Sequence, residues 1–187
     1  GTLQIQTYDE LCFPGLKEDW ANFRDSRPFV GTLSMGLDTD ADDEVAAWVA
    51  AGTPPICFGF GSMPLESAAD TVAMIGSVCA ELGERALICS GWTDYSAGPY
   101  FDHVKVVGAV SYEKIFPHCR AVVHHGGSGT TAAALRAGVP SLILWMAGDQ
   151  PFWGAQLKRL KVGTARKFIT TTPESLLSDL RQICTPD

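Results

Sequence analysis

The 187-residue sequence lacks the features that mark several large classes of protein. It contains no run of basic residues and carries a formal net charge of −7, which argues against nucleic acid as a partner. No apolar run approaches the roughly 18 residues that a membrane-spanning helix needs, so we expect no transmembrane segment. A signal peptide is also missing, and the opening residues, Gly1-Thr2-Leu3-Gln4, read like the start of a fragment of a longer protein.

Metal and disulfide motifs are equally scarce. The six cysteines form no CxxC pair, and several lie inside apolar runs such as Ile56-Cys57-Phe58, which is typical of buried, reduced thiols. We therefore expect a cytoplasmic protein, whose full-length parent could lie peripherally on a membrane. No cluster of His, Cys and acidic residues suggests zinc. Asp38-Thr39-Asp40 has the spacing of a metal-binding DxD pair, but it precedes a predicted helix amid other acids, which favours a solvated helix start.

Two regions differ in their pattern. Residues 1–53 are irregular and rich in turn residues, with one helix predicted over 42–51; regular alternation begins at Pro54. Short apolar runs predict strands at 56–60, 86–89, 104–107, 121–124, 141–145 and, at an edge, 162–165. Helical periodicity and capping residues predict helices at 66–82, 112–116, 129–137, 151–160 and 173–183.

Short buried strands that alternate with helices form βαβ units. The sequence therefore predicts an α/β fold, a doubly wound, Rossmann-like parallel sheet of five or six strands with helices on both faces. In such sheets ligands bind at the carboxyl ends of the strands, so those ends are where candidate site residues are sought.

The strongest local signal follows the fourth strand, where the run from His124 to Thr131 reads HHGGSGTT and opens a helix. Three glycines in four residues let the backbone approach a ligand closely, and free N–H groups at a helix start favour an anion. A histidine at the strand end can donate a hydrogen bond to a phosphate oxygen. The alternative is a tight strand-to-helix turn capped by Ser128 or Thr130, which two histidines and two threonines make the weaker interpretation.

Two further strand ends carry polar residues. Asp149 and Gln150 follow the fifth strand, where an acid and an amide together could hold several sugar hydroxyls; Asp149 could equally be a helix cap before Pro151. Ser62 follows the first strand in Gly59-Phe60-Gly61-Ser62-Met63-Pro64, as a helix cap or a phosphate contact. Because Pro64 leaves no third glycine, the dinucleotide fingerprint is incomplete and NAD is rejected.

Taken in order, these motifs resemble a known family. The set is similar to the C-terminal donor domain of GT-B glycosyltransferases of the sterol glucosyltransferase and glycopeptide-antibiotic glycosyltransferase type, over about residues 54–183. The motifs that carry the resemblance are Gly61-Ser62, Ser90-Gly91-Trp92, the His124–Thr131 run, Arg136-Ala137-Gly138-Val139-Pro140 and Gly148-Asp149-Gln150. The resemblance implies that residues 1–53 are an interdomain linker leading into the domain, that 54–187 bind a nucleotide sugar, and that an N-terminal acceptor domain is absent.

The resemblance also implies roles for individual residues. The sugar of the donor would be held by Asp149 and Gln150, and the nucleobase would lie near Trp92 and near Val110, the latter through its backbone. Taken alone, Trp92 is as well explained as a core residue. The diphosphate would be bound by Ser62, His124, Gly126, Gly127, Ser128, Gly129 and Thr130.

Two positions depart from the pattern of that family. Trp145-Met146 stands where relatives often carry proline and an aromatic residue, and Ser111 stands where many carry proline. The first departure leaves sugar selectivity open.

The resemblance implies the donor-binding half of an inverting glycosyltransferase that moves a hexose from a UDP- or dTDP-sugar to a hydroxyl of a lipid, sterol or natural-product acceptor. It implies no metal and no cofactor beyond the donor, and no catalytic residue in this stretch, because the general base is expected in the N-terminal domain. Fixed dipoles at the diphosphate would stabilise the leaving group. The alternatives are a non-catalytic nucleotide-sugar-binding module and a GT-B-like nucleotide-sugar epimerase.

Overall fold

The computed structural model describes residues 2–34, 36–60, 67–91 and 93–185, and its contacts divide the chain into two units, Gly1–Gly36 and Leu37–Asp187. The first unit holds a short helix, α1 (Leu16–Asp19), between two 3-10 turns, Glu10–Cys12 and Ala21–Phe23. A single parallel bridge joins Gln6 to Phe29, and the ring of Tyr8 contacts that of Phe29.

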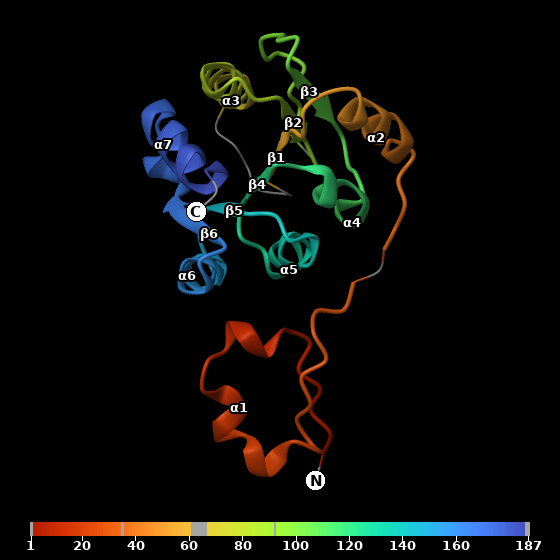
Figure 1. Ribbon diagram of the computed structural model, residues 1–187, viewed down its shortest axis with the longest axis vertical. Helices are drawn as coiled ribbons and strands as arrows, with labels where there is room; N and C mark the ends of the chain where they lie inside the picture. The colour runs from red at the N-terminus through yellow and green to blue at the C-terminus, as the bar shows by residue number, and fades with distance from the viewer. Residues whose placement is uncertain (1, 35, 61–66, 92, 186–187) are drawn as a thin grey trace. The chain divides into compact units, whose positions relative to one another are not determined.

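The second unit is built on a parallel sheet of six strands in the order β3-β2-β1-β4-β5-β6 (Figure 1). Five strands have the predicted bounds to within one residue, and the sixth, predicted as a short strand, is longer and pairs along all of β5. The predicted α/β fold with a parallel, Rossmann-like sheet is confirmed. The strands are β1 (Ile56–Gly59), β2 (Ala86–Cys89), β3 (Val104–Val107), β4 (Ala121–His124), β5 (Ser141–Trp145) and β6 (Gly163–Lys167).

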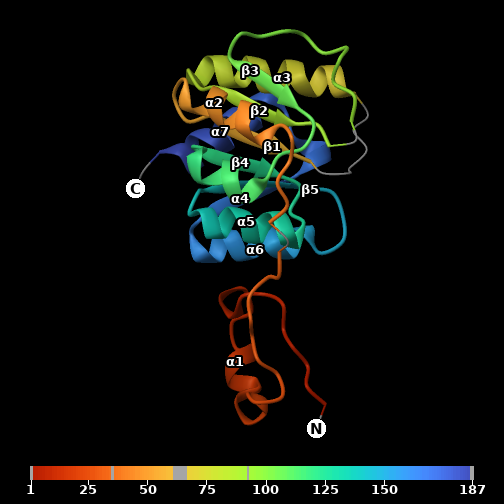
Figure 2. The same ribbon diagram turned by 90° about the vertical axis from the view of Figure 1, so that its right-hand side faces the viewer.

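Helices cover both faces of this sheet (Figures 1 and 2). Because successive strand residues point to opposite faces, Ile56 and Phe58 pack in one core while Cys57 packs in the other. The first core lies under α3 (Ala68–Leu82) and α7 (Pro173–Cys184), and Leu176 of α7 belongs to it. The opposite face carries the helices α2 (Asp42–Ala50), α4 (Tyr112–Ile115), α5 (Ser128–Ala137) and α6 (Gln150–Leu160).

Helix ends follow local sequence rules. The Ser67 hydroxyl accepts a hydrogen bond from the Asp70 N–H at 3.2 Å and caps α3, which begins two residues later than predicted. Gly83 and Gly138 end α3 and α5 in the left-handed conformation, at φ +69° in both cases. Thr172 and Ser175 form a reciprocal capping box at the start of α7. These signals are local, which is why the helix bounds could be predicted closely.

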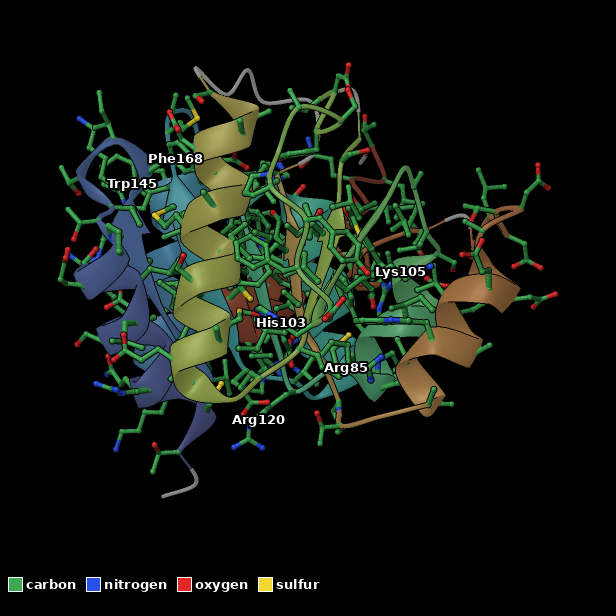
Figure 3. The ribbon with its side chains drawn as sticks, turned by 90° about the horizontal axis from the view of Figure 1, so that it is seen from above. Arg85, His103, Lys105, Arg120, Trp145 and Phe168 are labelled. Carbon is green, nitrogen blue, oxygen red and sulfur yellow. The ribbon has the colours of Figure 1, made fainter. Side chains whose placement is uncertain are left out.

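Helix α2 lies in the segment predicted to be a linker, yet it is packed in the second unit. Val45 and Val49 are buried in the core of that face. At its carboxyl end the Arg85 guanidinium donates to the carbonyl oxygens of Val49 at 3.1 Å and of Thr53 at 2.9 Å, and lies over the Trp48 ring (Figure 3). The contact division falls before α2, between residues 36 and 37, so residues 37–53 of the segment that the resemblance implies to be linker and domain entry belong to the second unit.

All six cysteines are free thiols, five of them buried, as their apolar neighbours predict. Cys57 and Cys89 lie on neighbouring strands with their sulfur atoms 3.8 Å apart. Within the described part of the chain, no helix is both long and apolar enough to cross a membrane.

Candidate functional site

The predicted diphosphate run begins at the centre of the sheet. Gly59, the last residue of β1, is paired in register with His124, the last residue of β4, and His124 is paired with Ile143 of β5. The connections after β1 and β4 lead to opposite halves of the sheet, because β2 lies on one side of β1 and β5 on the other side of β4. This switch point is where open α/β sheets bind their ligands.

The glycines after β4 form a tightly packed turn, and they leave the start of α5 without a side-chain cap. Gly126 has φ +93°, a conformation that favours glycine, and a Cβ there would lie 2.7 Å from Ile143 Cγ2. Gly127 occupies the N-cap position of α5, where no side chain caps the helix. The first helical bond runs from the Thr131 N–H to the Gly127 carbonyl at 2.9 Å. Ser128, Gly129 and Thr130 form the first turn, so their N–H groups are available to an anion.

The side chain of His124 is fully buried at the end of β4. Its Nδ1 accepts a hydrogen bond from the Gly126 N–H at 3.1 Å, so the proton of the neutral ring is on Nε2. Burial, with a smaller contribution from His125, lowers the pKa of His124 to about 3, and the ring is neutral near pH 7. Within the described residues Nε2 has no hydrogen-bond partner. His124 is thus a buried neutral donor that finds no acceptor in the described part of the chain.

The His125 side chain lies against Gly127 of the glycine run and close enough to Asp149 to be affected by its charge. Its ring sits against Gly127, where a Cβ would come within 2.5 Å of Nε2. Burial lowers the pKa of His125, while a hydrogen bond to the Gly59 backbone and the charge of Asp149 act in the opposite direction. Its Nδ1 is buried without a partner among the described residues. These contacts fit a role for His125 in supporting the turn.

The Asp149-Gln150 pair meets the glycine run directly. A Cβ on Gly126 would lie 3.2 Å from Gln150 Cβ, so the turn before α6 packs on the turn before α5. The Gln150 side-chain oxygen accepts from the Met146 N–H at 2.7 Å and the Ala147 N–H at 3.2 Å, which fixes its own loop. Asp149 stands at the N-cap position but makes no capping hydrogen bond; its Oδ2 accepts from the Trp153 indole N–H at 2.8 Å.

Trp145, the last residue of β5, lies at the same edge of the sheet as the Asp149-Gln150 turn. The Lys167 ammonium of β6 lies 5.7 Å from its ring centroid. Figure 3 shows Trp145 near Phe168, which follows β6 and meets the ring of Phe60 edge-on at 5.6 Å. Trp145 is one of the positions that depart from the pattern of the resembled family. It places an aromatic ring at the end of the strand that leads to the predicted sugar residues, Asp149 and Gln150.

The predicted nucleobase residues are only partly described. Val110 follows β3, and its side chain is buried in the core under α4, so only its backbone can meet a ligand. Ser62 and Trp92 lie outside the described residues.

The structure adds two residues that sequence reasoning missed. A Cβ on Gly59 would lie 2.8 Å from the Tyr112 hydroxyl, so this hydroxyl reaches the end of β1 from the start of α4. Burial raises the pKa of Tyr112, which keeps its hydroxyl protonated. Asp42 of α2 accepts a hydrogen bond from the Ser111 N–H at 2.8 Å. Both contacts join segments far apart in the chain, so no local pattern signals them.

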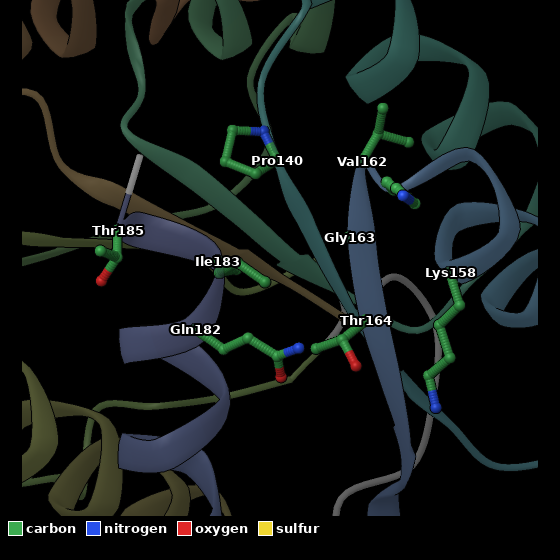
Figure 4. A pocket seen from close by; sticks show the side chains of 9 residues that line it. Pro140, Lys158, Val162, Gly163, Thr164, Gln182, Ile183 and Thr185 are labelled. Carbon is green, nitrogen blue, oxygen red and sulfur yellow. The ribbon is translucent and has the colours of Figure 1, made fainter. Parts of the chain in front are cut away.

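A separate hollow of about 650 Å³ lies at the other end of the strands, beside the amino ends of β5 and β6 (Figure 4). None of the predicted site residues lines it. Its lining consists of Pro140, Lys158, Lys161, Val162, Gly163, Thr164, Gln182, Ile183 and Thr185.

The family model for the C-terminal domain of erythromycin biosynthesis protein CIII-like proteins matches residues 93–186, half of the chain. The chain belongs to this family. An uncharacterized glycosyltransferase of Mycobacterium bovis is 65% identical over 187 residues, covering all of this chain and 44% of that protein. A sterol 3-beta-glucosyltransferase of Arabidopsis thaliana is 35% identical over 158 residues, which cover 83% of this chain and 26% of that protein. The chain thus spans less than half the length of these relatives.

Solved structures in this class share the fold. The calicheamicin glycosyltransferase CalG4 has a TM-score of 0.76 at 18% identity, covering 99% of this chain and 44% of that chain. The glycosyltransferase VinC, solved in complex with dTDP, has a TM-score of 0.60 at 21% identity, covering 81% of this chain and 37% of that chain. The predicted resemblance to GT-B glycosyltransferases, including those for sterols, is confirmed.

Proposed function

We propose that this chain is the donor-binding part of an inverting glycosyltransferase that uses a UDP- or dTDP-sugar. The observation that carries the proposal is His124, a buried neutral ring whose Nε2–H has no acceptor among the described residues. An unpaired buried donor costs roughly 1–3 kcal/mol, which an arriving acceptor atom would recover. A diphosphate oxygen is such an acceptor, and the uncapped start of α5 lies two residues beyond Gly126.

The other predicted residues complete the donor site in this proposal. Ser128, Gly129 and Thr130 bind the diphosphate through the helix start, with Ser62 on the β-phosphate, and Asp149 and Gln150 bind the sugar hydroxyls. Val110 and Trp92 meet the nucleobase. The VinC complex with dTDP supports a nucleoside diphosphate as the ligand class.

In this proposal, the chain's share of catalysis is stabilisation of the leaving diphosphate. As the bond between sugar and phosphate breaks, negative charge grows on the diphosphate, and N–H groups already aimed there lower the barrier without reorganising. The acceptor is a hydroxyl of a lipid, sterol or natural product, and its general base is in the N-terminal domain. The sterol glucosyltransferase relative supports a lipophilic acceptor.

Calorimetric titration tests the proposal with UDP, dTDP and uridine. We expect UDP or dTDP to bind and uridine to bind much more weakly. His124→Ala should weaken the diphosphate by about 10- to 100-fold, the loss of one hydrogen bond to a charged group, and leave uridine unchanged.

The matched control is His124→Gln, whose amide keeps a donor near Nε2 and should retain more affinity. Because the ring is buried, the proposal requires local opening at Nε2 on binding. Equal weakening of UDP and uridine in His124→Ala would remove His124 from the phosphate site.

A further inference from the structure

The loop between β3 and α4 is held by a residue from the far end of the unit's sequence. Asp42, the first residue of α2, is 3% exposed. Its Oδ1 accepts from the Ser111 N–H at 2.8 Å and from the Thr39 hydroxyl at 2.7 Å, while Oδ2 accepts from the Thr39 N–H at 2.9 Å. One carboxylate therefore ties the segment before α2 to the residue that follows Val110.

This carboxylate stays charged over the whole neutral range. The hydrogen bond from the Ser111 N–H, followed by those from Thr39, lowers the pKa of Asp42 to about 2. The Lys114 ammonium lies 3.8 Å from Asp42 Oδ2 and 2.9 Å from the carboxylate of Asp38. A buried charge with this many donors is a fixed anchor and not a titrating switch.

The backbone on either side of Val110 is occupied by this anchor. The Thr39 hydroxyl contacts the Ala109 carbonyl at 3.3 Å, and the Ser111 N–H is held by Asp42. Val110 itself has no hydrogen bond to any described residue through its own N–H or carbonyl, and its side chain is buried. A pyrimidine base offers an N–H donor and a carbonyl acceptor side by side, which match a backbone carbonyl and N–H.

The other hydrogen bonds and ion pairs that α2 makes with described residues do not reach this loop. Glu44 pairs with Lys105 of β3 at 2.6 Å, and Arg85 holds the other end of the helix (Figure 3). These contacts fix the helix on the sheet. Val45 and Val49 pack in the same core as the Val110 side chain, and among the hydrogen bonds of the described residues it is the one to Asp42 that connects the helix to the backbone beside Val110. The helix thus serves as the support from which Asp42 holds the loop.

We propose that Asp42 is a positioning residue for the nucleobase, because it holds residues 109–111 so that the Val110 backbone faces the ligand. The inference rests on the proposed function. It goes further in separating base recognition, which depends on α2, from diphosphate binding, which depends on α5.

The test compares Asp42→Ala with Glu44→Ala, which removes an acid from the same helical turn without touching the loop. UDP and inorganic pyrophosphate are titrated against each variant, and dTDP replaces UDP if the parent chain binds it better. We expect Asp42→Ala to weaken the nucleotide by about tenfold or more and to leave pyrophosphate unchanged. Glu44→Ala should leave both affinities unchanged.

Equal loss of both ligands in Asp42→Ala would show a general structural role and overturn the inference, as would an unchanged nucleotide affinity. Failure of the parent chain to bind any nucleotide would refute the proposed function instead. If Asp42→Ala does not fold, Asp42→Asn replaces it, because the amide keeps the size of the side chain and one acceptor oxygen but places an NH2 group where the second carboxylate oxygen accepts from Thr39 or Ser111. A smaller but equally selective loss of nucleotide affinity is expected, and its absence would contradict the proposal.

Discussion

Gly126 and Gln150 pack against each other so closely that a Cβ on Gly126 would lie 3.2 Å from Gln150 Cβ and 3.3 Å from its carbonyl oxygen. This contact brings the turn after β4 and the turn after β5 together. The phosphate and sugar halves of the proposed donor site are thereby built on one shared surface, which tolerates no side chain at residue 126.

We therefore predict that Gly126→Ala destabilises the chain and abolishes nucleotide binding. The alanine would be strained at φ +93° and would meet Ile143 Cγ2 at 2.7 Å. Strain and overpacking each cost roughly 1–3 kcal/mol, so a clear fall in melting temperature is expected. Thermal unfolding followed by circular dichroism measures it.

The matched control for stability is Gly129→Ala. A Cβ there meets nothing within 4 Å, and the residue is in the first turn of α5. Alanine stabilises a helix by up to about 1 kcal/mol relative to glycine, so the melting temperature should rise or stay constant. Similar destabilisation by both variants would mean that the contact between the two turns is not the cause.

The second prediction concerns pH. Burial lowers the pKa of His124 to about 3, well below its ordinary value of 6.5. Between about pH 3 and pH 6.5 the unfolded chain binds a proton at His124 that the folded chain excludes. The buried neutral ring therefore contributes its full stability above pH 6.5, and the free energy of unfolding falls as the pH drops below that value. One such group changes the free energy of unfolding by at most about 1.4 kcal/mol per pH unit.

His124→Gln removes this titrating group. Unfolding free energies measured by urea denaturation from pH 7.5 to 4.5 should fall less steeply in the variant than in the parent chain. His125 also has a lowered pKa and contributes to the slope in both, so the difference between the two slopes isolates His124. Identical slopes would show that the ring of His124 is accessible to protons.

The third prediction separates two roles of Asp149. Asp149→Ala should lower the extra affinity that the sugar gives to a nucleotide sugar, while the affinity for UDP itself changes little. The change also removes the hydrogen bond from the Trp153 indole, so Trp153→Phe is the control that breaks this bond and keeps the carboxylate. The lost bond, which is made to a charged carboxylate, costs roughly 1.5–3 kcal/mol in either variant.

Titrations with UDP and UDP-glucose against both variants make the measurement. If Trp153→Phe lowers the sugar contribution as much as Asp149→Ala, then the hydrogen bond orients the loop and Asp149 does not itself touch the sugar. The alternative predicted from the sequence, a helix cap, is not how the Asp149 side chain is used in the structure.

Much of the fold could be predicted because its signals are local. The apolar runs of β2 to β5 and the glycines after α3 and α5 lie next to the elements they delimit. The last strand was predicted too short because Arg166 and Lys167 are charged. Arg166 forms an ion pair with Asp179 of α7 at 2.7 Å, a partner that the strand's own sequence does not reveal.

The candidate site, like the fold, could be predicted where its signals are local and not where it depends on contacts between distant residues. Strand ends and glycine runs indicated the residues after β4 and β5, and the structure brings these two groups together. Asp42 was expected among solvated acids at a helix start, yet it is buried against the Ser111 N–H, 69 residues away. Such a contact depends on how α2 packs beside the loop between β3 and α4 in the folded protein. No local stretch of the sequence specifies that packing.

The last prediction is that this chain folds alone and transfers no sugar. Folding is expected because residues 37–187 contain a complete six-stranded sheet with its own core on each face. Thermal unfolding should therefore be cooperative. Transfer is not expected, because the proposed acceptor pocket and general base are in an N-terminal domain, and stabilising a leaving diphosphate does not activate an acceptor hydroxyl.

Incubation with UDP-glucose and a panel of sterol and phenolic acceptors, followed by mass spectrometry, makes the test. Slow hydrolysis of the donor is the most that the diphosphate site alone should produce, whereas a donor epimerised at one sugar carbon would favour an epimerase. Glycoside formed at the roughly 1–10³ s⁻¹ of ordinary enzymes would place a base within these residues and refute this division of labour.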